Sequence, residues 1–95
     1  MDSEEAAVSV FVVERFLPRL TGTDVSEHAR RETEVVAAGR ADIRHLRTVY
    51  LPDDELCLSL FEAPSIEALR RVNDQAGMAW ERITAAIDVE TETRR

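Results

Sequence analysis

The spacing of hydrophobic and polar residues along the chain predicts four β-strands. The first apolar run begins at Ala7, contains four valines and Phe11, and meets its first charged residue at Glu14. A near-continuous run of this kind is typical of a strand buried on both faces, usually a central one. Pro18 marks the exit from this strand. Three further apolar stretches predict strands over residues 43–51, 56–61 and 83–89.

The first predicted helix lies between the first two strands, over Val25–Ala38. Thr23 or Asp24 is a suitable N-cap, because a short polar side chain can accept a hydrogen bond from a free amide of the first turn. Glu27 supplies a negative charge where the helix dipole favours one. Gly39 is well placed to end the helix.

The second predicted helix, over Ile66–Ala76, follows a hairpin. Pro52 and the two aspartates after it form a turn signature between the second and third strands. Proline presets its own φ angle, and an aspartate side chain can bond its own backbone, so both residue types favour a turn. Ser65 caps the helix, and Gly77 ends it.

The resulting order, β-α-β-β-α-β, predicts an α+β fold of the ferredoxin-like type. In this fold a four-stranded antiparallel sheet carries two helices on one face. A length of 95 residues fits one domain and leaves no room for a second. We therefore expect a polar lead-in over residues 1–6, one domain over residues 7–89 and a polar tail over residues 90–95.

The face of the sheet away from the helices also carries apolar side chains. The third strand alternates three leucines on one side with Cys57, Ser59 and Phe61 on the other. Two such sheets packed face to face across a dimer would bury the second side. The pattern therefore predicts a homodimer of the dimeric α/β-barrel type.

The net charge of the chain indicates which classes of partner to expect. All 12 basic residues are arginines, and 19 acidic residues bring the net charge to −7. A negative chain repels phosphate backbones, so nucleic acid is not an expected partner. The apolar stretches are shorter than the ~18 residues of a membrane-spanning helix, and the acidic start does not resemble a signal peptide. With a single cysteine as well, we expect a cytoplasmic protein with no membrane partner.

Three polar residues fall within the apolar stripes of the predicted helices. His28 and Glu32 share one face of the first helix, and Asn73 lies between Ile66 and Leu69 on the second. Burying such groups without partners costs about 1–3 kcal/mol each. Either they bond with one another and with nearby arginine or tyrosine side chains, or they line a cleft that holds water or a ligand.

The His28–Glu32 pair also predicts a metal site, because side chains four residues apart on a helix can reach one ion. Imidazole suits nickel, zinc and copper, and a thiolate favours softer ions. The further ligand candidates, from the strands and their ends, are His45, Glu14, Glu62, Tyr50 and Cys57.

Two of the less polar residues admit more than one interpretation. Cys57 lies between leucines in mid-strand, where a cysteine is more typically a small buried hydrophobe than a nucleophile. Trp80 either closes the core or the dimer interface, or stacks on a ligand. Together with Asn73 and Tyr50, it is predicted to line the cleft between sheet and helices.

Several short stretches also carry a resemblance to a known family. They are Val12–Arg15, Tyr50–Cys57, Leu60–Pro64, Ala76–Gly77 and Glu81–Ile83. Together they resemble a family of small ferredoxin-like domains of unknown function that includes dimeric nickel-binding proteins. The resemblance covers roughly residues 8–88 and implies a dimer that holds nickel or another divalent metal. It assigns no ligand to a position of this chain and supplies no reaction.

Three functions follow from these observations. The first is a metal-binding dimer with His28 and Glu32 in its site. The second is a cofactor-free enzyme acting on a small molecule, because dimers of this fold resemble the antibiotic-biosynthesis monooxygenases, with His28, Asn73 and Trp80 orienting the substrate. The third is a binding module without catalysis. The resemblance places metal binding first.

Overall fold

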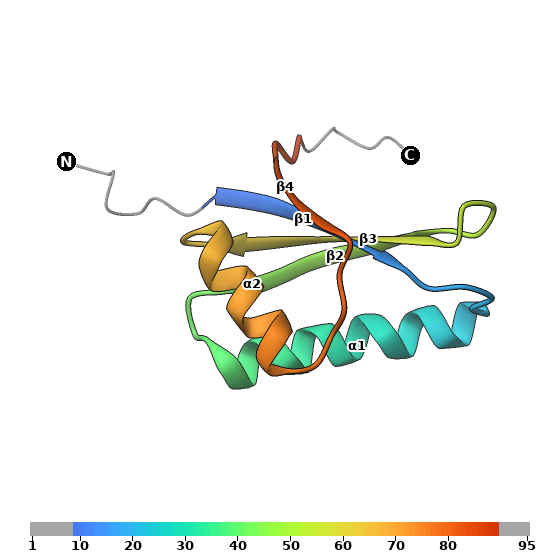
Figure 1. The fold of residues 1–95 in the computed structure, drawn as a ribbon, viewed down its shortest axis with the longest axis horizontal. Helices are drawn as coiled ribbons and strands as arrows, with labels where there is room; N and C mark the ends of the chain where they lie inside the picture. The colour runs from blue at the N-terminus through green and yellow to red at the C-terminus, as the bar shows by residue number, and fades with distance from the viewer. Residues whose placement is uncertain (1–8, 90–95) are drawn as a thin grey trace, which may run out of the picture.

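A computed structural model of the chain describes residues 9–89 and contains the six predicted elements in the predicted order (Figure 1). The predicted lead-in over residues 1–6 and tail over residues 90–95 lie outside the described residues. The elements are β1 (Ser9–Phe16), α1 (Gly22–Gly39), β2 (Arg44–Leu51), β3 (Leu56–Ala63), α2 (Ile66–Gln75) and β4 (Arg82–Ala86).

The four strands form one sheet in the order β2-β3-β1-β4, and each neighbouring pair is antiparallel. Both helices lie on the same face of this sheet (Figure 1). This is the arrangement of two split β-α-β units. The predicted α+β, ferredoxin-like fold class is therefore confirmed.

Helix α1 begins at Gly22 rather than at Val25, because its N-cap is Thr21. The Thr21 hydroxyl accepts a hydrogen bond from the Asp24 amide at 3.1 Å, and the Asp24 carboxylate accepts one from the Thr21 amide at 2.9 Å. This reciprocal capping box satisfies two amides that would otherwise be free. The predictions of Thr23 or Asp24 as the cap, and of Glu27 as the acidic residue of the first turn, were wrong by one turn.

Helix α2 has the ends that the sequence predicts, to within one residue. Ser65 is the N-cap, and its hydroxyl accepts a hydrogen bond from the Ala68 amide at 3.1 Å. The helix ends at Gln75, and Gly77 then takes a φ of +70°, a conformation that glycine adopts without a steric penalty. Neither α1 nor α2 is both long and apolar enough to cross a membrane.

Strand β1 extends to Phe16, so it includes Glu14 and Arg15 and ends before Pro18, as the sequence predicts. Its pairing with β3 extends to Phe16 opposite Leu56. Glu14 and Arg15 therefore lie within the sheet and point to opposite faces, since side chains alternate along a strand. Arg15 shares the buried, helix-covered face.

Strand β4 ends at Ala86 rather than at Val89. Ala86 pairs with Val10, close to the first residue of β1, so the ladder between these two strands stops there. The prediction extended the strand too far because apolar residues continue after its last pairing partner.

Strand β2 contains a bulge between His45 and Arg47. His45 lies opposite Phe61, and Thr48 lies opposite Ser59, although three residues separate His45 from Thr48. In a regular strand that separation would place the two side chains on opposite faces. The bulge therefore directs both of them towards the helices.

The two faces of the sheet differ in their cover. The core between the sheet and the helices consists of Phe11, Val13, Val36, Ile43, Phe61, Ala63, Ala68, Leu69, Val72 and Ile83. The opposite face, which we call the open face, carries half-buried Val10, Val12, Leu56, Leu58 and Leu60. No helix of residues 9–89 covers the open face (Figure 1).

Candidate functional site

Glu32 stands at the centre of a buried polar cluster between α1 and the sheet, and only 1% of it is exposed. One carboxylate oxygen, Oε1, accepts hydrogen bonds from Thr48 Oγ1 at 2.8 Å and Ser59 Oγ at 2.7 Å. The other, Oε2, accepts two from Arg15, through Nε at 3.0 Å and Nη2 at 2.9 Å. Side chains of three strands thus engage both oxygens.

The surroundings of Glu32 keep its carboxylate ionised. Burial alone would raise its pKa, because a low-dielectric interior disfavours charge. The imidazole of His28, the charge of Arg15 and the hydroxyl of Ser59 outweigh burial and lower the pKa of Glu32 to about 2. The carboxylate is therefore negative throughout the physiological pH range.

Arg15, which is 2% exposed, joins Glu32 to the second helix. Its Nη2 donates to Asn73 Oδ1 at 2.7 Å, and its Nη1 donates to the carbonyl oxygen of Ala79 at 2.9 Å. The Asn73 amide nitrogen donates in turn to the Leu69 carbonyl at 2.8 Å. Of the two alternatives left by the sequence, internal pairing thus describes both Glu32 and Asn73.

His28 lies one turn before Glu32 on α1, and its ring differs from the rest of the cluster. Its Nε2 lies 3.5 Å from Glu32 Oε2, an ion-pair distance without hydrogen-bond geometry. Among the described residues, this nitrogen is the one buried side-chain polar atom without a hydrogen-bond partner. The Cys57 side chain and then Glu32 raise the pKa of His28 to about 9, against the opposing effect of burial.

Cys57 projects from β3 towards the helices and is fully buried. Its side chain lies beside the His28 imidazole, and its Sγ lies 3.7 Å from Ser59 Oγ. The thiol is free. The structure therefore brings an imidazole nitrogen and a sulfur together next to the Glu32 carboxylate.

His45 approaches Glu32 from β2, with its Nε2 3.6 Å from Oε1. Its ring is already bonded at both nitrogens, since Nδ1 lies 2.8 Å from Thr33 Oγ1 and Nε2 lies 2.7 Å from Thr48 Oγ1. Burial lowers the pKa of His45, which favours the neutral ring. His45 therefore has no free nitrogen for a ligand.

Two acidic candidates lie on the other side of the sheet. Glu14 accepts hydrogen bonds from Arg82 on the open face, at 3.0 and 2.8 Å. Glu62 pairs there with Arg44 at 3.1 Å. The sheet therefore separates both carboxylates from His28.

The two aromatic candidates have partners of their own. The Tyr50 hydroxyl donates to the carbonyl oxygen of Leu17. Trp80 Nε1 donates to Asp74 Oδ1 at 3.0 Å, and the Arg70 guanidinium lies 5.8 Å from the centre of its ring. Neither ring lines the pocket beside His28.

That pocket has a volume of about 190 Å³ and lies where the end of β1 meets α1 and the connection after α2. Arg15, His28, Arg31 and Met78 are among its lining residues. It gives the imidazole, whose side chain is 16% exposed, a route to solvent. Asn73 lies behind Arg15 and does not line the pocket.

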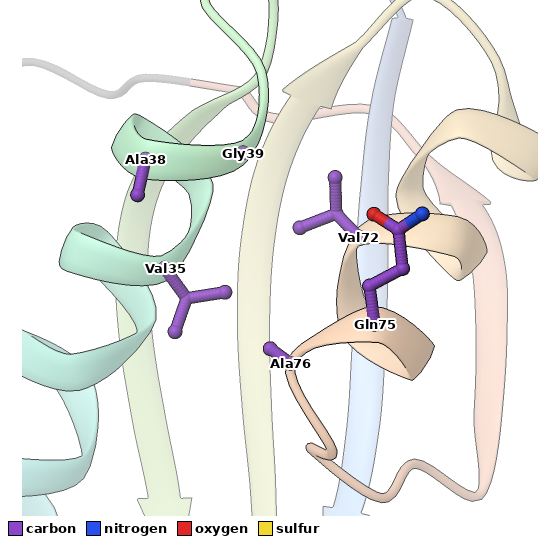
Figure 2. A pocket seen from close by; sticks show the side chains of 6 residues that line it. All are labelled: Val35, Ala38, Gly39, Val72, Gln75 and Ala76. Atoms are coloured by element: carbon purple, nitrogen blue, oxygen red, sulfur yellow. The ribbon is translucent and has the colours of Figure 1, made fainter.

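A second hollow, of about 260 Å³, lies between the two helices (Figure 2). Its lining residues are Val35, Ala38, Gly39, Val72, Gln75 and Ala76. None of these side chains titrates or binds metal, so the candidate site is the cluster around His28.

Sequence reasoning missed Arg15, Thr48 and Ser59 as members of this cluster. Arg15 has the same strand parity as the buried Phe11 and Val13, and this parity alone would have placed it inward. Ser59 shares the parity of Cys57. Thr48 carried no such signal, because the bulge changes the parity of β2.

The donor atoms near His28 fit a metal ion only in part. Within residues 9–89, no three side chains of histidine, cysteine, aspartate or glutamate gather closely enough to enclose an ion. The nearest candidate ligand atoms are His28 Nε2, which has no hydrogen-bond partner, and the Cys57 sulfur, which contacts Ser59 Oγ. A nitrogen and a sulfur suit borderline ions such as nickel and zinc.

Comparison with known proteins places this geometry in context. A model of the family described as "Nickel responsive protein SCO4226-like" matches residues 11–85, well over half of the chain. The chain belongs to this family. The segment that matches the SCO4226-like family contains His28, Glu32 and Cys57, and the match confirms the resemblance seen in the sequence. No curated protein and no solved structure matches the chain.

Proposed function

We propose that this chain binds a divalent metal ion of the nickel type and that His28 is its principal ligand. The observation that carries the proposal is the buried Nε2 of His28, which lacks a hydrogen-bond partner. A buried nitrogen usually has a hydrogen-bond partner, and once the ring loses its proton a metal ion would supply one. Membership of a nickel-responsive family supports nickel as the ion.

Cys57 is the second ligand in this proposal. Imidazole and thiolate together favour nickel, zinc or copper over magnesium or calcium. Both side chains must lose a proton to bind, so binding releases protons. The remaining coordination positions fall to water or to a small ligand that enters with the ion through the pocket beside His28.

The size of that pocket favours an ion over an organic substrate. Its volume is about 190 Å³, whereas sites for drug-sized ligands are ~300–1,000 Å³. Neither Asn73 nor Trp80, the other residues expected to orient a substrate, lines it. Metal binding therefore ranks ahead of the monooxygenase-like alternative.

Glu32 has an indirect role in this proposal. A carboxylate next to a ligating histidine orients the ring and raises its basicity. Both oxygens of Glu32 already accept hydrogen bonds from the protein, so we assign it this orienting role. Direct ligation by Glu32 stays a prediction from the sequence.

The test is a calorimetric titration of chelator-stripped protein with NiCl₂ and ZnCl₂. The His28→Gln variant should bind at least tenfold more weakly, a loss of ~1.4 kcal/mol or more. His45→Gln is the matched control, since that ring is equally near Glu32 but has both nitrogens bonded. It should leave the affinity unchanged. Absence of binding heat in the wild type would refute the metal proposal.

A second measurement examines the sulfur ligand. A thiolate bound to nickel or cobalt gives a charge-transfer absorption band, which a hydroxyl ligand does not produce. The band should appear when the wild type is titrated with NiCl₂ and should be absent from Cys57→Ser. An unchanged spectrum in the variant would remove Cys57 from the site.

We further propose that the chain forms a homodimer through the open face. The centre of this face is apolar, with half-buried Val12, Leu58 and Leu60. Ion pairs lie around that centre, namely Arg44–Glu62 and Arg82–Glu14. An apolar centre with a polar rim is typical of protein interfaces, and two sheets can pack face to face.

Light scattering after size exclusion tests the dimer. The wild type should elute with twice the mass of one chain, and Leu60→Arg should elute as a monomer. Gln75→Arg, which adds the same charge on exposed α2, is the control and should remain dimeric. A wild type that is monomeric at every concentration would contradict this proposal.

A further inference from the structure

The guanidinium of Arg15 occupies a cage made of oxygen atoms from three different parts of the chain. Glu32 Oε2 on α1 accepts from Nε and Nη2, at 3.0 and 2.9 Å. Asn73 Oδ1 on α2 and the Ala79 carbonyl oxygen after α2 accept at 2.7 and 2.9 Å. Arg15 is the largest fully buried side chain among the described residues.

These oxygens are of the kinds that bind hard metal ions. Carboxylate, amide and backbone carbonyl oxygens are the usual ligands of calcium, magnesium and manganese. Here they converge on a guanidinium, whose planar fork matches the carboxylate. Arg15 therefore takes the place that a hard cation would otherwise fill, and it neutralises Glu32 from within the chain.

The neighbouring donors are of a different kind. His28 Nε2 is buried and unpartnered, and the Cys57 thiol lies beside it. Glu32 Oε2 is near both sets of donors, at 2.9 Å from Arg15 Nη2 and 3.5 Å from His28 Nε2. The cluster thus divides into an oxygen set bound to Arg15 and a nitrogen–sulfur pair without a hydrogen-bond partner for His28 Nε2.

We propose that Arg15 determines the metal selectivity of this chain, because it occupies Glu32 Oε2, Asn73 Oδ1 and the Ala79 carbonyl oxygen and so keeps them from incoming ions. Ions that require oxygen ligands find none free, and the nitrogen–sulfur pair alone decides which ion binds. The inference rests on the proposed metal function and names the residue that restricts it to the nickel and zinc class.

The decisive variant is Arg15→Met, which keeps an unbranched side chain but removes the cation. With Glu32, Asn73 and Ala79 released, MnCl₂ should bind at least tenfold more tightly than to the wild type, a gain of ~1.4 kcal/mol or more. Manganese should also raise the melting temperature of the variant, because an ion that binds only the folded state stabilises it. Calorimetry and thermal melts measure the two effects.

Two control variants separate this role from a purely structural one. Arg15→Lys keeps a positive charge at the position and should bind manganese no better than the wild type. The double variant Arg15→Met/Glu32→Gln loses the carboxylate as well as the cation, and it should lose the gain in manganese affinity. If Arg15 had only a structural role, no variant would show manganese binding that depends on Glu32.

Loss of a buried charge partner destabilises a protein, so Arg15→Met is expected to be less stable than the wild type. If it is unfolded without metal, MnCl₂ should refold it, as followed by circular dichroism. Failure to bind manganese, in a folded or refolded variant, overturns the inference, as does failure to refold. A wild type without nickel binding refutes the proposed function, whereas nickel binding without the manganese gain refutes only the role of Arg15.

Discussion

Charged side chains are buried on one face of the sheet and exposed on the other. Glu14 and Arg15 are neighbours in β1, yet they point to different faces. Arg15 enters the buried cluster with Glu32, whereas Glu14 pairs on the open face with Arg82, whose side chain is 69% exposed. The same strand thus supplies one charge to an interior network and another to a surface ion pair.

This difference shows that strand parity decides what an ion pair contributes. An exposed pair typically contributes 0–1 kcal/mol or so, since water and salt screen it. Removing one member of a buried pair leaves an uncompensated charge in the interior, which costs roughly 3–5 kcal/mol. Matched substitutions on the two faces measure this contrast directly.

The largest effect is expected from removing the buried carboxylate. Glu32→Ala leaves Arg15 without its charge partner and should lower the free energy of unfolding by about 3–5 kcal/mol. Glu14→Ala on the open face should lower it by about 1 kcal/mol or less. Urea unfolding measures both. Equal losses in the two variants would show that the buried cluster is no more important than the surface pair.

A second pair of substitutions compares apolar burial on the two faces. Leu69 is fully buried, so Leu69→Ala should cost about 2–5 kcal/mol. Leu60 is half-buried on the open face, so Leu60→Ala should cost less in a monomer. In a dimer its cost should depend on protein concentration, because dissociation is then coupled to unfolding. Denaturant unfolding at two concentrations tests this, and a Leu60 effect equal to that of Leu69 at both would contradict it.

The pH dependence of stability should follow the buried cluster. The pKa of Glu32 falls from 4.5 to about 2 on folding, so its contribution is present above pH 4.5 and is lost as the pH falls towards 2. The pKa of His28 rises from 6.5 to about 9, so its contribution is present below pH 6.5 and is lost as the pH rises through 9.

His45 changes the pH dependence of stability in the opposite direction from His28. Its pKa is lowered on folding, so its contribution is present above pH 6.5 and is lost at lower pH. Urea unfolding between pH 2 and 10 should therefore show a loss above pH 6.5 that is absent from His28→Gln. The loss should remain in His45→Gln, and its persistence in His28→Gln would contradict the assignment.

The smallest change in stability is expected from substituting two threonines, one on each face of the sheet. Thr48 donates a hydrogen bond to Glu32, so Thr48→Val should cost about 1–2 kcal/mol. Thr84 is exposed on the open face, opposite Val12, and Thr84→Val should change stability by about 0.5 kcal/mol or less. Thermal melts of the two variants measure the difference. A loss at Thr84 as large as the loss at Thr48 would contradict this comparison.

The fold was predictable because its signals are local. Apolar periodicity, the serine cap at Ser65 and the stop at Gly77 each depend on residues close together in sequence. The inward positions of Glu32 and Asn73 also follow from helix geometry alone. The capping box at Thr21 was missed because Asp24 is itself a good N-cap, and only the observed hydrogen bonds distinguish the two.

The composition of the cluster was less predictable because it depends on tertiary pairing. Arg15 lies at the end of the predicted strand, where a charged side chain normally reaches solvent, and its parity alone does not show that Glu32 and Asn73 would surround it. The proximity of Cys57 to His28 depends on which face of β3 the helices cover. Neither fact can be obtained from the spacing of residues within one element.

The bulge in β2 has a consequence for how the length of this chain can change during evolution. Residues on both sides of Leu46 have partners in β3, with His45 opposite Phe61 and Arg47 opposite Leu60, while Leu46 has none. A descendant that lost Leu46 would keep every partner in the ladder and every side chain on its present face. Deletion of a residue elsewhere in β2 would turn part of the strand over. Leu46 is thus the position in β2 where the loss of one codon keeps the strand register.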